Sequence, residues 1–201
     1  HSFPSLRSSD LTIYTEFDRK LNASTETIQP GATLLVGQDF NVGKMASVIY
    51  VKREKMHGIK DADGVTQLVM VEELHAVAEI DKGQDTPDVI RILKERYQDV
   101  RDFHPIYIFP DASGNNTSSK CASVSDISLL EDAGFAVYTD ASNPRVKDRI
   151  MSVNGMFCNG NGVRRLFVNV AACPRFTECL EQQVWGDNGE PIGRAPGRER
   201  G

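Results

Sequence analysis

The segment TLLVGQDFNVGKMASVIYV, Thr33–Val51, decides the fold of this chain. Two apolar runs, Leu34–Val36 and Val48–Val51, flank a stretch that contains Asn and Gly, a pattern typical of two antiparallel core strands joined by a turn. Asp39 lies where the first run ends. A carboxylate there is costly to desolvate, and either hydrogen bonds from turn amides or a divalent metal ion can offset that cost. The rest of the chain must decide between these two interpretations.

The composition is that of a globular protein. The chain has 201 residues, of which 40% are hydrophobic and 25% are charged, which is enough for one well-buried domain and short for two. No apolar run approaches the roughly 20 residues that cross a bilayer, so no membrane partner is expected. The four cysteines include no CxxC pair, which argues against structural zinc. The net charge of -5 argues against indiscriminate DNA coating, but it is compatible with an acidic, metal-binding nuclease that has local basic patches.

Apolar runs and turn signals predict the order of strands and helices. Residues 1–30 are expected to be a linker or N-terminal arm with one short helix near Tyr14–Leu21, and residues 186–201 a flexible C-terminal tail. The predicted elements between them are strands at Leu34–Phe40, Ala46–Lys52 and Gln67–Val71, with a solvated loop from Arg53 to Gln67 that turns at Asp63-Gly64; then a helix opened by Thr86 as N-cap and Pro87, a strand at Pro105–Phe109, a helix at Ser123–Ala133, a strand at Phe135–Thr139, a helix at Val146–Cys158, a strand at Arg164–Val168 and a helix at Cys173–Trp185.

This order, with hairpin-like strands first and crossover units afterwards, predicts an α/β fold with a mixed central β-sheet and helices on both faces. In such a sheet the first and fourth strands can be neighbours, which would bring Asp39 and Asp111 to one edge. Glu73, predicted to face inward, or an acid on a helix would complete the cluster. Because carboxylates at close range repel each other, we expect Mg²⁺ or Mn²⁺ between them.

Five short motifs follow one another between about Gly31 and Trp185: GQDFNVGKMASVIYV, EELH, IYIFPDASGNN, NPRVKDRIMSVNGMFCNG and RRLFVN. Together they resemble the C-terminal nuclease domain of the large terminase subunit of tailed bacteriophages. The resemblance implies an RNase H-like fold over residues 31–185 and a metal-dependent endonuclease that cuts concatemeric double-stranded phage DNA. No GxxxxGKS/T phosphate-binding loop occurs in the sequence, so the ATPase motor of the full-length subunit is expected to lie outside this chain.

The resemblance also implies roles for individual acids. Asp39 matches the first-strand acid that bridges two metal ions, Asp111 matches the acid after the fourth strand, and Glu73 is expected to be a further ligand. The final acid of the family has no match, and Asp148 or Asp187 is a candidate for its place. Two Mg²⁺ or Mn²⁺ ions about 4 Å apart would then clamp the scissile phosphate.

Basic side chains near these motifs are candidate phosphate contacts, which position DNA without reading its sequence. Each of them can equally be a solvated surface charge. His75 is a candidate for orienting a ligand or a water, although a structural role is the commoner one for a lone histidine. The candidate DNA-binding residues are Arg53, Lys55, Arg145, Lys147, Arg149, Arg164 and Arg165.

The partners implied by the resemblance are double-stranded DNA, an ATPase motor domain, a small terminase subunit and a portal protein. The implied location is the host cytoplasm and, transiently, the procapsid portal. Two alternatives stay open. One is another RNase H-like nuclease, such as a resolvase or a transposase core. The other is a non-catalytic assembly module that docks on the portal or the motor.

Overall fold

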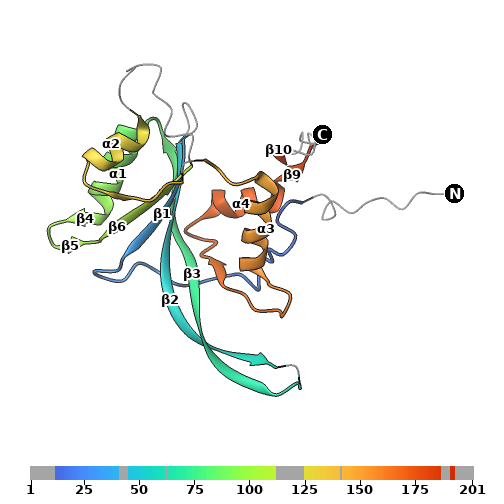
Figure 1. The fold of residues 1–201 in the computed structure, drawn as a ribbon. Helices are drawn as coiled ribbons and strands as arrows, with labels where there is room; N and C mark the ends of the chain where they lie inside the picture. The colour runs from blue at the N-terminus through green and yellow to red at the C-terminus, as the bar shows by residue number, and fades with distance from the viewer. Residues whose placement is uncertain are drawn as a thin grey trace, which may run out of the picture.

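A mixed six-stranded sheet forms the centre of the molecule (Figure 1). The computed structural model describes residues 12–40, 45–61, 63–111, 125–140, 142–186 and 191–192. The strand order is β7-β6-β1-β2-β3-β8, with β1–β2 and β2–β3 antiparallel and the other pairs parallel. The bounds of these strands are β1 Leu34–Asp39, β2 Met45–Lys60, β3 Thr66–Gly83, β6 Ile106–Pro110, β7 Ala136–Val137 and β8 Leu166–Val168.

Helices cover both faces of the sheet, which confirms the predicted α/β architecture (Figure 1). Because successive strand residues point to opposite faces, Ile49 packs in the core beneath α1 and α2, while Val48 and Tyr50 pack in the core beneath α3 and α4. The helices are α1 Thr86–Tyr97, α2 Asp126–Asp132, α3 Val146–Phe157 and α4 Pro174–Gln182. Short strand pairs, β4 Gln98–Asp99 with β5 Asp102–Phe103 and β9 Val184–Trp185 with β10 Pro191–Ile192, lie outside the main sheet.

The two faces are not covered to the same extent. The core beneath α1 and α2 includes side chains of β1, β2, β3 and β6. Among the described residues, the core beneath α3 and α4 draws its strand side chains from β2, β3 and β8, and includes none from β1, β6 or β7. On the α3 and α4 side, half of the sheet is therefore left open beside the helices.

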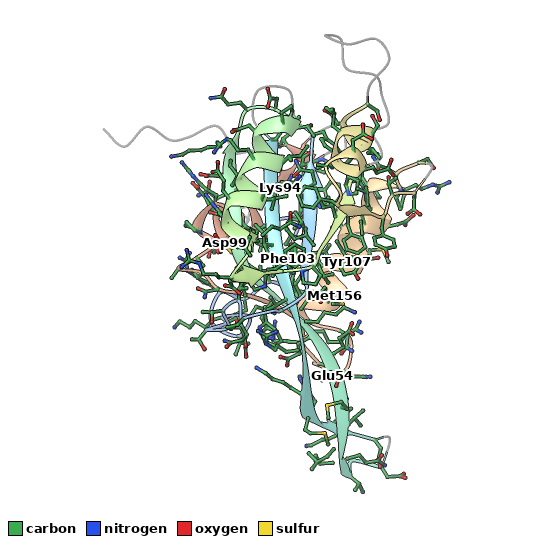
Figure 2. All side chains as sticks on the ribbon, turned by 90° about the vertical axis from the view of Figure 1, so that its left-hand side faces the viewer. Glu54, Lys94, Asp99, Phe103, Tyr107 and Met156 are labelled. Atoms are coloured by element: carbon green, nitrogen blue, oxygen red, sulfur yellow. The ribbon has the colours of Figure 1, made fainter. Side chains whose placement is uncertain are left out.

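β2 and β3 extend past the sheet as a two-stranded ribbon, which corrects the loop expected between Arg53 and Gln67. Figures 1 and 2 show the ribbon projecting from the body, with Glu54 along it. Pairing continues as far as Lys60 and Thr66, and Gly64 supplies the positive φ of 79° at the turn. Charged residues form strands here because the ladder pairs their backbone groups while both faces remain open to water.

The N-terminal segment and the cap of one helix also differ from expectation. No helix is assigned within the described residues 12–33, so the short helix predicted near Tyr14–Leu21 is wrong. That segment packs on the body instead, since the buried Asn22 amide donates to two backbone carbonyls at 2.9 Å each. Asp85, not Thr86, caps α1 and accepts from the Asp88 amide. Within the described residues, no helix has the length and apolar character required to cross a membrane.

Candidate functional site

Parallel pairing of β1 with β6 brings two acids to the same edge of the sheet. Gln38 lies opposite Pro110 in the register, and the Asp111 amide donates to the Gln38 carbonyl at 3.0 Å. Asp39 and Asp111 are therefore the next residues on strands that lie about 4.8 Å apart. The expectation that the first and fourth strands are neighbours is confirmed.

The two acids line a cavity of about 900 Å³, which we call the strand-end cavity. It lies where the open half of the sheet meets the α3 and α4 helices. Phe109 and Tyr138 line one part, Tyr14 and Phe176 another, and Arg149 reaches it from α3. A cavity of this size can hold a ligand of several heavy atoms rather than a single ion.

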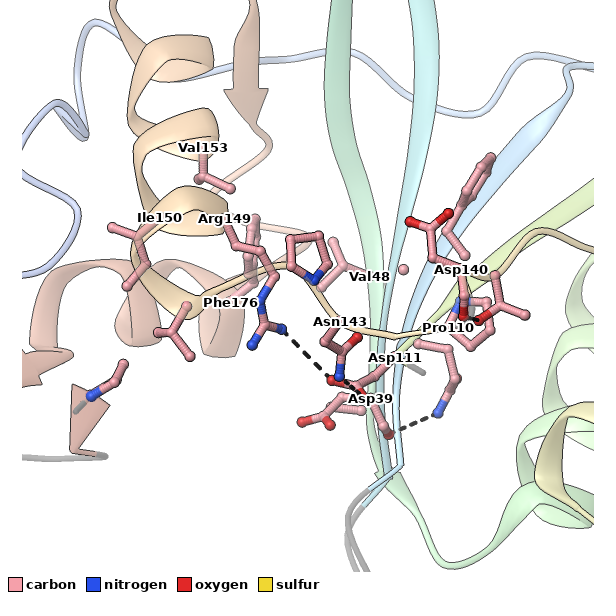
Figure 3. A pocket seen from close by; sticks show the side chains of 18 of the residues that line it. Asp39, Val48, Pro110, Asp111, Asp140, Asn143, Arg149, Ile150, Val153 and Phe176 are labelled. Carbon is pink, nitrogen blue, oxygen red and sulfur yellow. Dashed lines mark hydrogen bonds and ion pairs between the residues drawn. The ribbon is translucent and has the colours of Figure 1, made fainter. Parts of the chain in front are cut away.

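The electrostatics of the cavity depend on the acid pair. Burial of the Asp39 carboxyl raises its pKa, and the charge of Asp111 raises it further. Asp111 in turn accepts a hydrogen bond from the Asn143 side chain at 2.7 Å and lies 3.7 Å from the Arg149 guanidinium. Figure 3 shows Arg149 pointing from α3 toward Asp111. A cation placed between the carboxylates would relieve their repulsion.

The donor set fits a hard divalent cation. Mg²⁺ in proteins is commonly held by one or two carboxylates, with waters and substrate phosphates as the other ligands, and Asp39 and Asp111 provide two adjacent carboxylates. Within the described ranges, no group of three or more His, Cys, Asp or Glu side chains could hold a metal ion. The described side chains therefore suit an open cation site rather than a closed protein cage.

Asp140 is a third acid that lines the strand-end cavity, and sequence reasoning did not select it. It follows β7, which pairs in parallel with β6 through Tyr107–Ala136 and Ile108–Val137. Three neighbouring parallel strands thus each have an acid at or just beyond their carboxyl end. The signal is present in the sequence, because Asp140 directly follows the predicted strand Phe135–Thr139, and Asp111 follows another predicted strand after one proline.

Glu73 lies elsewhere, which corrects the expectation that it joins Asp39 and Asp111. It pairs with Arg53 on β2, whereas Asp39 pairs with Ala46; that separation of seven positions is up to roughly 23 Å of strand. Glu73 is 4% exposed. His57 Nε2 and His75 Nε2 contact its carboxylate at 2.6 and 2.9 Å. Glu73 is therefore buried as a member of a hydrogen-bond cluster.

His75 is held on both sides. Its Nδ1 lies 2.8 Å from the Ser24 hydroxyl and its Nε2 contacts Glu73, while the Phe167 ring stacks on it at 5.1 Å. Burial lowers the pKa of His75, and its contact with Glu73 opposes that change. His75 therefore belongs to the Glu73 cluster and does not line the strand-end cavity.

The other candidate site residues are dispersed. Asp148 is exposed at the start of α3 and does not line the strand-end cavity, and Asp187 lies outside the described residues. Arg53 and Lys55 contact Glu26 at 2.9 and 3.1 Å. Of the seven basic candidates, Arg149 alone lines the strand-end cavity. Arg145 and Lys147 are exposed at the start of α3. Arg164 donates a hydrogen bond to Asn22, and Arg165 lines a separate groove.

Comparison with known proteins finds similarity at the level of the fold. No protein-family model and no curated protein sequence matches the chain. Solved structures of the large terminase from a thermophilic bacteriophage match 92% of this chain and 42% of theirs, with a TM-score of 0.58 at 17% identity in one crystal form. The complex of that terminase with ATP-γ-S gives a TM-score of 0.60 at 16% identity. This chain thus has the fold of a terminase segment and spans about two-fifths of the matched chain's length.

Proposed function

We propose that this chain is a metal-dependent endonuclease domain of a phage-type large terminase, with an RNase H-like fold. The observation that carries the proposal is the meeting of Asp39 and Asp111 at the ends of β1 and β6, inside a cavity large enough for part of a DNA strand. The similarity of the fold to a phage terminase supports this choice over a resolvase or a transposase core. Double-stranded DNA is the proposed substrate, and Mg²⁺ or Mn²⁺ is the proposed cofactor.

The polar side chains around the acid pair each have a task in this proposal. Asp39 and Asp111 would hold the cations, two in number as the resemblance implies, and so be neutralised enough to accept a phosphate. When bound, the ions would activate water and stabilise the departing oxygen. Asn143 orients the Asp111 carboxylate through its 2.7 Å hydrogen bond. Arg149, once it releases Asp111, would contact a phosphate oxygen with its guanidinium.

The remaining partners follow from the same proposal. A chain that spans about two-fifths of the matched terminases would act together with an ATPase motor domain, a small terminase subunit and a portal protein. It would work in the host cytoplasm and, transiently, at the procapsid portal. Its cleavage would show little sequence preference, since phosphate contacts position DNA without reading its sequence.

The test is cleavage of supercoiled plasmid by the whole chain in Mn²⁺ or Mg²⁺. Asp39→Asn should reduce cleavage at least 100-fold, because losing a residue that merely supports a metal ligand already costs about 10- to 100-fold. Asp132→Asn, an exposed acid at the end of α2, is the matched control and should cleave normally. Cleavage that Asp39→Asn leaves unchanged would refute the proposal.

A second measurement examines the site without relying on turnover. Anomalous scattering from crystals soaked in Mn²⁺ should show density between Asp39 and Asp111. Crystals without manganese there, together with plasmid that stays intact, would instead favour the assembly module that docks on a portal or a motor.

A further inference from the structure

Two aromatic rings stand exposed beside the acid pair. Phe109 on β6 is 46% exposed and Tyr138, directly after β7, is 55% exposed. Their rings are nearly parallel, with an interplanar angle of 18° and centroids 5.5 Å apart. The Tyr107 ring lies 5.8 Å from that of Tyr138. These three residues form a continuous aromatic surface on the open half of the sheet.

The alternation of β6 explains why this surface is open. Ile106 and Ile108 are buried in the core beneath α1 and α2, so Tyr107 and Phe109 must point to the opposite face. That face lies outside the core formed with α3 and α4. Among the described residues, these large rings therefore lie where no helix covers them.

The aromatic surface continues directly into the strand-end cavity. Phe109 and Tyr138 line that cavity together with Asp39, Asp111 and Arg149. Asp111 is two positions after Phe109 on the same strand, and Arg149 reaches the acid pair from α3 (Figure 3). Because the rings, the acids and Arg149 line one cavity, it suits a ligand that combines a flat ring with an anionic group.

We propose that Phe109 and Tyr138 form a stacking platform for an unpaired nucleobase of a DNA strand. This inference rests on the proposed nuclease function. A nucleotide has the required combination, since its base can lie on the rings while its phosphate lies by Arg149 and the neutralised acids. Every base has a π-face, so stacking tolerates sequence. Since a paired base is stacked within the duplex and unavailable, the platform favours locally unpaired DNA over intact duplex.

The experiment uses the whole chain and a single-stranded oligonucleotide of thymidines with one central 2-aminopurine. Ca²⁺ is present to neutralise the acids, and both binding and 2-aminopurine fluorescence are recorded. Phe109→Leu combined with Tyr138→Leu should weaken binding about 5- to 150-fold, as expected for loss of base–aromatic stacking, and should abolish the quenching of 2-aminopurine. Tyr138→Phe keeps a ring and should retain both signals.

The matched control is Phe103→Leu. Phe103 is 57% exposed on β5, just before the start of β6. The acid pair lies at the other end of β6. Phe103 and Tyr107 are labelled in Figure 2. This variant should bind and quench as the original chain does. Circular dichroism and thermal unfolding of all variants establish that the exposed substitutions leave the fold intact.

Failure of the platform and failure of the nuclease give different results. Equal binding and quenching in the double variant and in Phe103→Leu would overturn the platform, even where Asp39→Asn abolishes plasmid cleavage. Quenching that disappears only in the double variant would support the platform, even where Asp39→Asn leaves cleavage unchanged and the nuclease proposal falls.

Discussion

The carboxylates of Glu73 and of the Asp39–Asp111 pair have opposite surroundings. On the ribbon side of β3, two histidines contact the single carboxylate of Glu73, and the Lys55 ammonium lies 3.7 Å from it. At the strand ends, Asp39 and Asp111 face each other, and the charge of Asp111 contributes to the raised pKa of Asp39. One region surrounds one acid with donors, whereas the other brings two acids together.

The difference separates structure from candidate function. A buried carboxylate with several donors is stable as it stands and needs no ligand. Two adjacent carboxylates raise the energy of the folded chain until a cation binds, and such perturbed groups cluster at functional sites. Inward direction alone, which was the reason for selecting Glu73, does not identify a metal ligand.

The largest change in stability should come from replacing Glu73, the carboxylate that is surrounded by donors. Glu73→Ala removes the carboxylate that His57 and His75 contact and should lower the free energy of unfolding by about 2–6 kcal/mol, since each buried group left without its hydrogen-bond partner costs about 1–3 kcal/mol. Urea unfolding measures this loss. The neighbouring Glu72→Ala is the control, because Glu72 is exposed and paired with Lys52, and its loss should cost at most about 1 kcal/mol.

Cleavage by Glu73→Ala sharpens the contrast. If the folded variant cuts plasmid at the original rate per folded molecule, its acid is structural. Loss of cleavage at unchanged stability would restore Glu73 as a candidate metal ligand.

Asp111→Asn should affect cleavage strongly and stability little, the reverse of Glu73→Ala. We expect cleavage to fall at least 100-fold, equivalent to about 2.7 kcal/mol of activation free energy, while urea unfolding changes little because repulsion with Asp39 is removed. Plasmid nicking in Mn²⁺, measured beside urea unfolding, tests both halves. A strongly destabilised Asp111→Asn would show that its contacts with Asn143 and Arg149, rather than a cation, define its role.

Divalent metal should stabilise the chain through the strand-end acids alone. At a free Mn²⁺ concentration ten times its Kd, linkage predicts a gain of about 1.4 kcal/mol. Thermal unfolding with and without Mn²⁺ should show this gain in the original chain and in Glu72→Ala, but not in Asp39→Asn. An equal gain in Asp39→Asn would place the cation elsewhere.

The smallest effect is a pH dependence of opposite sign in the two regions. Burial lowers the pKa of His75, so the unfolded chain binds more protons and stability falls as the pH drops below about 6.5. Burial and Asp111 raise the pKa of Asp39, so its contribution to stability increases as the pH falls through that raised pKa toward about 4.

Urea unfolding between pH 7.5 and 5.5 isolates the His75 contribution. The original chain should lose stability more steeply than His75→Asn, with Lys55 and Glu26 as the other charges near this ring. Equal slopes in the two proteins would contradict the assignment.

The local pattern of apolar and polar residues is enough to predict the mixed sheet and the pair Asp39 and Asp111. The apolar runs at Leu34–Val36 and Ile106–Phe109 are strong, and a carboxylate within a few residues after such a run indicates a strand end, so Asp39 and Asp111 can be selected from the sequence. Asp140 obeys the same rule and was missed because the rule was not extended to the weaker strand before it.

The ribbon and the Glu73 cluster were harder to predict, for physical reasons. Near the tip of the ribbon most side chains of both strands are exposed, so that part lacks the apolar alternation that reveals a half-buried strand. The partners of Glu73 come from both strands of the ribbon, and His75 in turn contacts Ser24 in the N-terminal segment. No spacing in the sequence specifies such a convergence.

The parallel pairing of β1 with β6 has a consequence for how the molecule folds. β2 and β3 are joined by a short turn, so their ribbon needs only local contacts and can form early. The pairing of Leu34 with Ile106 must instead close a long loop across the ribbon and α1, which costs chain entropy before any contact repays it. We therefore expect the acid pair to assemble late in folding, so partly folded chains would carry the ribbon but not the acidic site.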